Sequence, residues 1–470
     1  METNLIEKAF SAEHFREEAY QLINYIANRM ELSASDTPQN TINWTPPEEQ
    51  LKFWENDFNS GASENMAAFW AKLFLHSINS HSRGYMGHQV AVTPALTVLT
   101  GAVMAFLNNS TTVYEIGMTA NAMEKIVLHY LSGKFGYHED STGVVTSGGS
   151  LGNLTALITA RTSSGISEQD YSRLAIMVSA DAHYSVERAA EIMGIPTENI
   201  LKIPFDEQHC IRTDLLEPTY QQATAQGKLV YCVIGCAGTT AVGAYDDLDA
   251  LADFAEQHKL WFHVDGAHGA AVVFSEKYRH YLHGIERSDS LIVDFHKMLL
   301  APSISTAVLY NARNRQINEF SPSAAYLWHN QLSEEWYNSA KHTLECTKPI
   351  TILHTYAILK RYGDKLYQQH IDYLYDLGQT FAKMVSERKT MELAVEPSSN
   401  IVCFRYCAGE HDLDEMNAAI LQKLLEDGEF YIVSTTIGDR FYLRVSLMNP
   451  LTRSEDIQRL LDKIEMFANQ

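Results

Sequence analysis

The sequence predicts an α/β fold with a mainly parallel, doubly wound sheet and a small C-terminal α/β domain. Three observations support this prediction. Short β-branched runs alternate with longer helical segments between about residues 84 and 348. Most of these runs are apolar throughout, as strands buried on both faces must be. Such alternation favours parallel strands, with helices on both faces of the sheet. Beyond residue 348 the pattern changes to long helices around a few β-rich runs.

The three predicted parts follow in chain order. Residues 1–83 form an N-terminal helical segment, in which the amphipathic stretches His14–Arg29 and Met66–Ile78 flank a linker rich in Pro, Asn and Thr. Such a linker argues against a packed core at that point. Residues 84–348 form a large domain. Its predicted strands are Gly143–Thr146, Ala175–Ser179, Leu229–Gly235, Leu260–Val264, Ser290–Asp294 and Ser305–Leu309. Residues 349–470 form a small domain, whose runs NIVCFRY, FYIVSTT and RFYLRVSL predict an antiparallel sheet.

Composition excludes some partners and locations. The chain has 36 Lys and Arg against 58 Asp and Glu, a formal net charge of −22, which disfavours nucleic acid and anionic membranes as partners. The beginning of the sequence shows no signal peptide, and no apolar run approaches membrane-spanning length. The cysteines lack zinc-site spacing, and several lie in apolar runs, so we expect reduced, buried thiols, no metal site and a cytoplasmic protein. The cysteines are Cys210, Cys232, Cys236, Cys346, Cys403 and Cys407.

A Gly-rich turn is the first segment with chemical content. In GVVTSGGSLGNLT a strand runs into small residues, and a helix over Leu151–Arg161 begins at once. Backbone N–H groups at a helix N-terminus bind anions, and Ser150 adds a hydroxyl donor, so Gly149 and Ser150 are candidate phosphate ligands. A tight turn with a Ser N-cap is the structural alternative.

Two further segments follow strand ends. Asp265 in HVDGAHGA can pair with a protonated pyridine nitrogen, and Ala267 is small enough for a flat ring to lie on it; a turn or N-cap Asp is the alternative. Lys297 in SLIVDFHKMLLAPS lies in an apolar stretch, where desolvation favours a neutral, nucleophilic amine; a surface lysine is the alternative. His296 beside it could donate to phosphate.

His183 in DAHYSVERAAEIMG completes the set. It follows the strand Ala175–Ser179 and could stack on an aromatic ring, although a structural histidine is the alternative. Each segment alone is weak. Together they predict an anion site, a stacking histidine, a pyridine-pairing carboxylate and a reactive lysine at successive strand ends.

The sequences of these segments resemble those of the group II pyridoxal-phosphate decarboxylases of aspartate-aminotransferase-like fold (fold type I). They include glutamate, aromatic-amino-acid, diaminobutyrate and lysine decarboxylases. The resemblance runs from about His81 to Lys348 and is carried by HSRGYMGHQ, TSGGSLGNLTAL, DAHYSVERAA, GTTAVGAYDDLDAL, HVDGAHGAAVVF and YRHYLHGIERSDSLIVDFHK. It implies an enzyme that decarboxylates an L-amino acid to its amine with pyridoxal phosphate, as a homodimer with active sites at the interface.

The resemblance also implies residue roles. Lys297 would be the Schiff-base lysine, and His183 would stack on the ring. Thr239 matches a threonine near the cofactor. Tyr326 in SAAYLWH takes the place of a loop tyrosine that protonates the α-carbon, whereas phenylalanine there would imply an aldehyde product. The remaining implied cofactor residues are Gly149, Ser150, Asp265, Ala267 and His296.

Departures from the family pattern bear on the substrate. Relatives commonly have Asn-Pro before His-Lys, but this chain has Asp294-Phe295. This motif is closer to that of the diaminobutyrate and lysine decarboxylases. We therefore expect a small or basic amino acid, with an aromatic one as the alternative. His88 and Lys348 are candidate substrate ligands, although Lys348 stands where aromatic-type members carry arginine. A decarboxylating aldehyde synthase, an aminotransferase and a non-enzymatic regulator remain alternatives.

Overall fold

The computed structural model describes residues 4–62, 65–311, 336–338, 341–409 and 412–470. The chain divides into two compact units. The smaller unit comprises residues 1–88, 380–394 and 403–470, and the larger unit comprises residues 89–379 and 395–402. Within the described ranges, none of the helices is long and apolar enough to cross a membrane.

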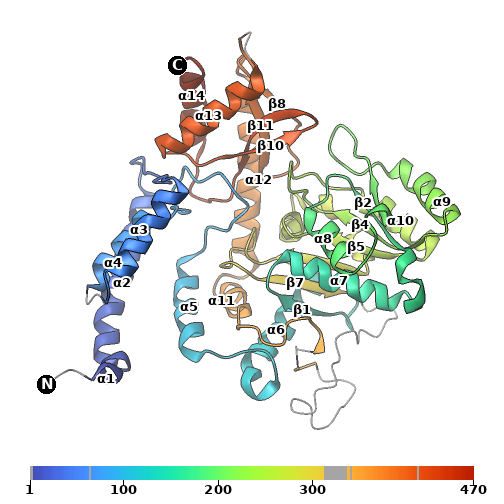
Figure 1. Ribbon diagram of the computed structural model, residues 1–470, viewed down its shortest axis with the longest axis horizontal. Coiled ribbons are helices and arrows are strands. Elements are labelled where there is room, and N and C mark those ends of the chain that lie inside the picture. Colours follow the sequence, from blue (N-terminus) through green and yellow to red (C-terminus); the bar gives the residue numbers. More distant parts are fainter. Residues whose placement is uncertain (1–3, 63–64, 312–335, 339–340, 410–411) are drawn as a thin grey trace. The chain divides into compact units, whose positions relative to one another are not determined.

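Helices and strands alternate through most of the larger unit (Figure 1). The helices are α1 (Leu5–Ala9), α2 (Ala12–Ala34), α3 (Pro47–Asn59), α4 (Met66–Leu75), α5 (Ala95–Leu107), α6 (Tyr114–Lys134), α7 (Gly149–Ser163), α8 (Tyr184–Ile192), α9 (Leu216–Ala225), α10 (Leu248–His258), α11 (Ile352–Tyr362), α12 (Asp364–Ser386), α13 (Leu413–Asp427) and α14 (Ser454–Ala468). The strands are β1 (Thr142–Thr146), β2 (Leu174–Ser179), β3 (Ile200–Ile203), β4 (Leu229–Cys236), β5 (Trp261–Asp265), β6 (Ser290–Asp294), β7 (Thr306–Tyr310), β8 (Met391–Leu393), β9 (Ile401–Tyr406), β10 (Val433–Ile437) and β11 (Arg440–Ser446).

The larger unit contains a seven-stranded sheet with the order β1-β7-β6-β5-β4-β2-β3. β2 pairs in parallel with β3 and β4, and β5 pairs in parallel with β4 and β6. β7 runs antiparallel to both of its neighbours, β1 and β6. The predicted mainly parallel sheet is therefore confirmed, with every predicted strand present. β3 is an additional strand that the sequence patterns did not indicate.

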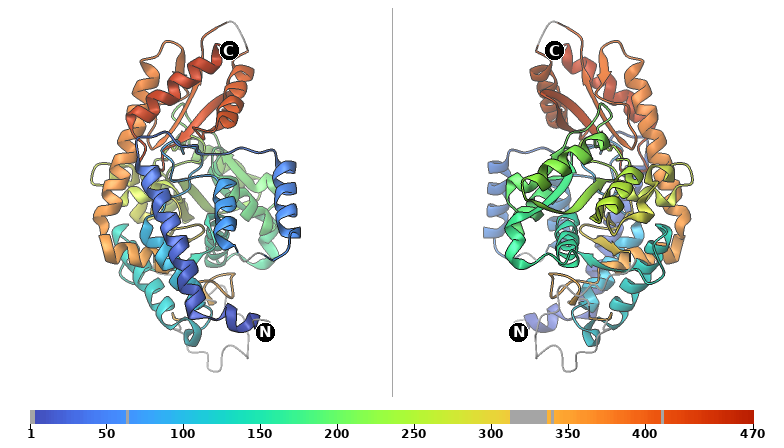
Figure 2. Two further views of the ribbon diagram at one scale, coloured as in Figure 1. Left: turned by 90° about the vertical axis from the view of Figure 1, so that its left-hand side faces the viewer. Right: turned by 90° about the vertical axis from the view of Figure 1, so that its right-hand side faces the viewer.

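Helices cover both faces of this sheet, and Figure 2 shows α7–α10 gathered around its strands. On one face, α7 and α8 pack over apolar side chains such as Ile176, Ile234 and Ile292, in one buried cluster. On the opposite face, a Cβ built on Gly235 of β4 would lie 2.8 Å from Leu251 of α10. Side chains alternate between the faces along a strand, so the sheet is doubly wound, as predicted.

The C-terminal part contains a second sheet of four strands with the order β10-β11-β9-β8. β10 pairs antiparallel with β11, and β8 pairs antiparallel with β9. The small sheet that the C-terminal β-rich runs predicted is therefore present, and these two pairings have the predicted antiparallel direction. β8 has three residues and was not predicted.

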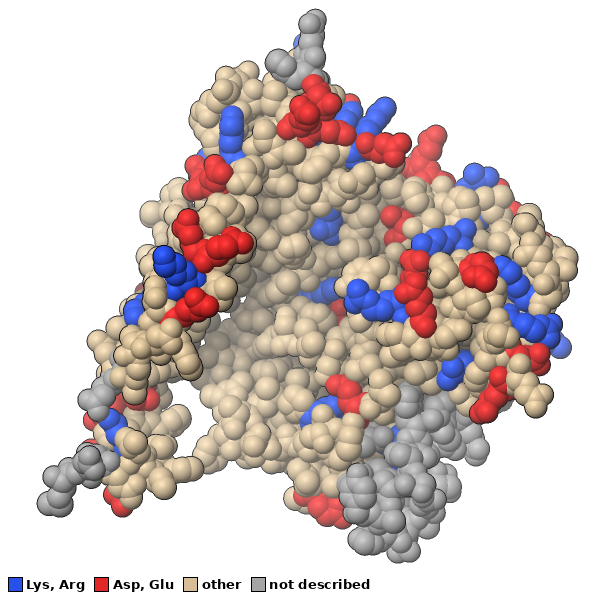
Figure 3. Space-filling view, viewed as in Figure 1, with Lys and Arg blue, Asp and Glu red and all other residues tan. Residues whose placement is uncertain are grey.

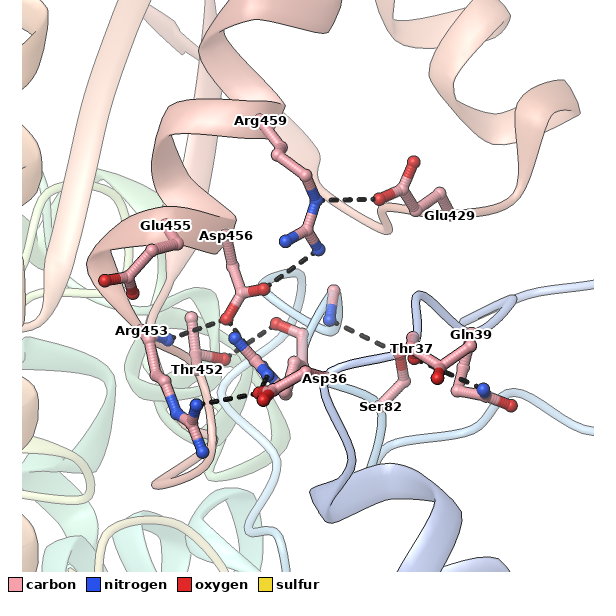
Figure 4. A network of polar contacts seen from close by, with 12 residues as sticks. Asp36, Thr37, Gln39, Ser82, Glu429, Thr452, Arg453, Glu455, Asp456 and Arg459 are labelled. Carbon is pink, nitrogen blue, oxygen red and sulfur yellow. Dashed lines mark hydrogen bonds and ion pairs between the residues drawn. The ribbon is translucent and has the colours of Figure 1, made fainter.

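In the smaller unit, a network of polar side chains connects the N-terminal range, residues 1–88, with the C-terminal range, residues 403–470 (Figure 4). Asp456 of α14 is fully buried and accepts hydrogen bonds from Arg83 at 2.8 Å and Arg459 at 2.9 Å. Asp36, in the predicted linker, accepts from Arg83 and Arg453, each at 2.9 Å. These charge-assisted bonds tie the N-terminal linker to the C-terminal helix.

The surface mixes charges of both signs despite the net charge of −22. Figure 3 shows acidic and basic side chains interspersed on the face viewed there. In the larger unit, Arg287 pairs with Asp249 at 2.6 Å, Asp253 at 2.7 Å and Glu256 at 3.0 Å. All six cysteines are free thiols, and Cys232, Cys236 and Cys403 are buried, as the apolar runs around them predicted.

Candidate active site

A cavity of about 280 Å³ lies in the larger unit, at the C-terminal ends of β1, β2, β4, β5 and β6. This is where open α/β sheets bind ligands. Every predicted cofactor-binding residue lines it, namely Gly149, Ser150, His183, Thr239, Asp265, Ala267, His296 and Lys297. The other lining residues are Ser147, Gly148, Asn153, Ser185, Cys236, Gly238, Thr240, His268, Ile292, Asp294 and Ile304.

The turn between β1 and α7 forms one wall of the cavity. Gly148 is the N-cap of α7 with φ of 99°, a backbone conformation that L side chains rarely adopt. No side chain caps the helix, which disagrees with the alternative of a Ser N-cap. The first N–H groups of a helix have no acceptor within it. This turn therefore directs N–H groups that have no acceptor within the helix toward the cavity at Gly149 and Ser150, as an anion site requires.

Asp265 lies at the end of β5 and is 8% exposed. Its Oδ2 accepts a hydrogen bond from Asn153 Nδ2 at 2.9 Å, and its Oδ1 accepts from the Ala267 backbone N–H at 3.2 Å. Two donors thus fix a carboxylate that lines the cavity, where it can pair with a cationic group.

His183 is the N-cap of α8. Its Nδ1 lies 2.7 Å from Ser185 Oγ. The pKa of its imidazole is lowered from 6.5, chiefly because burial disfavours the charged ring, although Asp265 raises it. A neutral ring is therefore the dominant form near pH 7, and such a ring can stack on a flat aromatic ligand.

Lys297 follows β6, and its side chain is 20% exposed. Its Nζ lies 3.0 Å from Asp294 Oδ2, and Thr306 Oγ1 donates to the other oxygen of Asp294 at 2.5 Å. His296 Nε2 is 3.6 Å from Asp294 Oδ2. Lys297 is therefore a partly accessible amine held by a buried carboxylate, and it is not a surface lysine.

The other predicted site residues are Tyr326, His88 and Lys348. Tyr326 lies outside the described residues. His88 belongs to the smaller unit, where its ring centroid is 5.9 Å from that of Tyr431. Lys348 is 4% exposed, lies 3.4 Å from Glu124 and does not line the cavity.

Among the polar lining residues that sequence reasoning missed, Asn153 and Ser185 contact predicted site residues. Asn153 is 1% exposed on α7, one helical turn after Gly149, and Ser185 is 2% exposed in the first turn of α8. Asn153 Nδ2 donates to Ser185 Oγ at 2.9 Å. A polar amide within the apolar run of a helix was the available signal, because such a group is buried only with partners.

Comparison with known proteins identifies the same enzyme family that the sequence motifs resemble. The family model described as "Pyridoxal-dependent decarboxylase conserved domain" matches residues 86–407. An aromatic-L-amino-acid decarboxylase of Bacillus atrophaeus is 27% identical over 474 residues, which cover 98% of this chain and 96% of the relative. An L-2,4-diaminobutyrate decarboxylase of Acinetobacter baumannii is 27% identical over 419 residues, which cover 84% of this chain and 81% of the relative.

A solved structure gives the same result. The glutamate decarboxylase domain of the diaminobutyrate-pyruvate transaminase and L-2,4-diaminobutyrate decarboxylase from Vibrio parahaemolyticus superposes with a TM-score of 0.84 at 26% identity. The match covers 98% of this chain and 96% of that structure. The chain therefore belongs to the pyridoxal-dependent decarboxylases, fold type I carboxy-lyases that act on amino acids with pyridoxal phosphate.

Proposed function

We propose that Lys297, Asp265 and His183 form the centre of the active site, and that the substrate is a small or basic L-amino acid. The observation that carries the site assignment is that these three residues and the first turn of α7 line one cavity. They come from the C-terminal ends of four different strands, β1, β2, β5 and β6. Their convergence is consistent with one ligand that has several distinct functional groups.

The lining fits the groups of pyridoxal phosphate. For the phosphate it offers the uncapped first turn of α7, the Ser150 hydroxyl and His296. For the pyridine nitrogen it offers the Asp265 carboxylate, and for covalent attachment the Lys297 amine. His183 and Ala267 would lie against the ring, and Thr239 also lines the cavity. Bound pyridoxal phosphate supplies an electron sink for the bond that breaks when carbon dioxide leaves.

The chain's own residues would orient and stabilise the reactants. Asp265 would favour a protonated ring nitrogen through its negative charge, and its two hydrogen bonds prevent the carboxylate from rotating. The His183 ring, neutral because of burial, would add stacking without adding charge. Tyr326 would return a proton to the carbon that has lost carbon dioxide. The contributions of Asp265 and His183 are orientation and electrostatics, and that of Tyr326 is general acid catalysis.

The proposed substrate class rests on the segment Asp294-Phe295-His296-Lys297 and on the diaminobutyrate decarboxylases among the similar proteins. An aromatic amino acid is the alternative, supported by the relative from Bacillus atrophaeus. The test is release of carbon dioxide from the proteinogenic amino acids, ornithine and 2,4-diaminobutyrate. Highest turnover on a small or diamino acid is expected, and highest turnover on tyrosine, tryptophan or phenylalanine would contradict the proposal.

Product analysis tests the role of Tyr326. Amine as the product supports proton return by Tyr326, whereas aldehyde with ammonia, formed with dioxygen as the two-electron oxidant, would make the enzyme an aldehyde synthase. Tyr326→Phe is the matched variant, because it removes the hydroxyl and keeps the ring. This variant should shift the product from amine towards aldehyde.

We also propose a cytoplasmic homodimer. Large apolar side chains are exposed in both units, including Phe10 at 88%, Phe58 at 86% and Phe106 at 88%. Exposure of this kind is typical of a surface that another chain covers. Light scattering during gel filtration should give about twice the 53.0 kDa of one chain. A mass of 53.0 kDa in the holoenzyme would contradict the proposed dimer.

A further inference from the structure

We propose that Asn153 is a positioning residue that orients both Asp265 and His183 through one directed chain of buried hydrogen bonds. The inference rests on the proposed function, because it takes Asp265 and His183 as cofactor contacts. It adds that these two contacts, which lie on different elements, depend on a single amide of α7.

The local structure explains why Asn153 reaches both contacts. Asn153 lies on the face of α7 that packs against the sheet and is 1% exposed. His263 and Asp265 are two residues apart on β5, so their side chains lie on the same face of the sheet. Both contact Asn153, whose Oδ1 is 3.0 Å from His263 Nε2 and whose Nδ2 is 2.9 Å from Asp265 Oδ2.

The second arm of the amide leads to His183. Asn153 Nδ2 has two hydrogens, and it also donates to Ser185 Oγ at 2.9 Å. Ser185 Oγ lies 2.7 Å from His183 Nδ1. Because the serine oxygen accepts from the amide, its own hydrogen is available for the imidazole nitrogen.

A donor-only group fixes the direction of the chain at its start. The Trp261 indole can only donate, and its Nε1 lies 2.8 Å from Ser290 Oγ. Ser290 Oγ is also 2.8 Å from His263 Nδ1. Burial lowers the pKa of His263 to about 4, so its ring is neutral at pH 7 and carries one N–H. The Asn153 oxygen needs that N–H on Nε2, so His263 Nδ1 accepts from Ser290.

An acceptor-only group fixes the direction at the other end. A carboxylate has no hydrogen to donate, so the NH₂ group of Asn153 must face Asp265 and its carbonyl oxygen must face His263. The chain then runs from Trp261 through Ser290 and His263 to Asn153, where it divides. One branch fixes the Asp265 carboxylate. The other adds the Ser185 hydroxyl to the Ser185 backbone N–H, which is 3.3 Å away, as a donor to His183 Nδ1. The proton of the neutral ring then lies on Nε2.

The arrangement has a testable consequence, because one substitution should disturb two cofactor contacts at once. Asn153→Asp is nearly isosteric, but it replaces the NH₂ group by an oxygen 2.9 Å from Asp265 Oδ2. Two carboxylates at that distance repel each other unless they share a proton. Pyridoxal phosphate should then bind more weakly, and more so as pH rises, while Ser185 loses its donor.

The experiment measures the dissociation constant of pyridoxal phosphate and the absorbance of the bound cofactor, each across pH 5.5–9, for the full-length variants. We expect Asn153→Asp to raise the dissociation constant at least tenfold at pH 8 and to shift the pH dependence of the absorbance. Thr159→Val is the matched control, because its hydroxyl is equally buried on α7 but bonds to Thr155 and Tyr310. The control should match wild type in both measurements.

Two further variants make the outcomes decisive. If Asn153→Asp does not fold by circular dichroism, Ser185→Ala tests the second branch alone, and a dissociation constant raised at least threefold is expected. An unchanged constant and an unchanged pH dependence in the folded variant tested would overturn the inference. Asp265→Asn separates this failure from failure of the proposed function. If Asp265→Asn also binds and absorbs like wild type, the assignment of Asp265 is wrong. If only Asp265→Asn is impaired, the role of Asn153 is wrong.

Discussion

Replacing Lys348 by methionine should destabilise the larger unit, because it breaks a buried ion pair at the edge of the sheet. Lys348 Nζ lies 3.4 Å from Glu124 Oε1, and the two side chains are 4% and 9% exposed. β1 is an edge strand, so Val145 pairs with β7 on one side only. On its other side, Glu124 accepts the Val145 N–H at 2.9 Å, and Lys348 donates to the Val145 carbonyl at 2.5 Å. The ion pair therefore satisfies an otherwise unpaired strand edge.

The magnitude follows from this geometry. At 3.4 Å, the attraction is about 5 kcal/mol with an effective dielectric constant of about 20. Desolvation offsets part of that attraction while both charges are present, but removing one partner leaves the other buried and unpaired. Lys348→Met should therefore lower the free energy of unfolding by about 3–5 kcal/mol. Glu124→Gln should lower it by less, because the amide oxygen still accepts from Val145.

Urea denaturation of both single variants and the double variant measures the coupling. Neither charge remains in the double variant, so its loss of stability should be at least about 1 kcal/mol smaller than the sum of the single losses. Additive losses would refute the role of the pair at the strand edge.

The same variants test whether Lys348 binds the substrate carboxylate. A lost hydrogen bond to a charged group costs about 1.5–3 kcal/mol, so such a role would raise KM roughly 10- to 100-fold even in the double variant, which retains no unpaired charge. Since Lys348 does not line the cavity, we expect the KM of the double variant to stay within about threefold of wild type. A KM that remains raised would favour the substrate role.

Three other predictions concern the cofactor and pH. Lys297→Ala should lose the absorbance of bound cofactor during gel filtration and should release no carbon dioxide; retention of either would contradict covalent attachment at Lys297. Burial lowers the pKa of His370 to about 4, so the folded state binds this proton less readily than the unfolded chain. Stability should therefore fall as pH drops from about 6.5 to about 4, by about 3 kcal/mol from this group, and His370→Phe should flatten that part of the urea-midpoint curve. Burial raises the pKa of Asp246 to about 7, against the two backbone N–H groups that lower it. Its contribution is present below about pH 4 and is lost as pH rises through about 7, so Asp246→Asn should flatten the neutral part of the same curve. Curves identical to wild type would refute the assignments of His370 and Asp246.

Continuous apolar runs predicted the central sheet because its strands are covered by helices on both faces. β2 and β6 are buried at every residue, and both appear in the sequence as uninterrupted apolar segments. β3 was missed for the converse reason. It is a four-residue edge strand whose third residue, Lys202, is exposed, so it has neither the length nor the pattern of a buried strand. Pairing with β2 decides its conformation, and sequence patterns do not show that pairing.

The cavity was predictable to the extent that strand ends determine it. Asp265 ends β5, and Lys297 follows the neighbouring parallel strand β6, so both lie on one edge of the sheet. The partners of these residues were not predictable, because each partner comes from another element. Asn153 contacts Asp265 only because α7 packs across the sheet beside the C-terminal end of β5. The pairing of Lys348 with Glu124 likewise depends on where α6 lies beside β1.

The Gly-rich turn illustrates how packing and chemistry share one sequence motif. Its small residues predicted close approach of an anion, yet the structure uses two of the glycines against the sheet. A Cβ on Gly152 would lie 3.2 Å from Ile292 and 3.3 Å from Thr306, and one on Gly149 would lie 3.3 Å from Asp294. Contacts this short require the neighbouring atoms to move. The antiparallel β7 separates β1 from β6. The proposed anion site at the start of α7 can therefore lie beside Lys297 only if α7 packs closely across β7. The glycines allow that crossing, and they thereby bring the proposed phosphate site and Lys297 into one cavity.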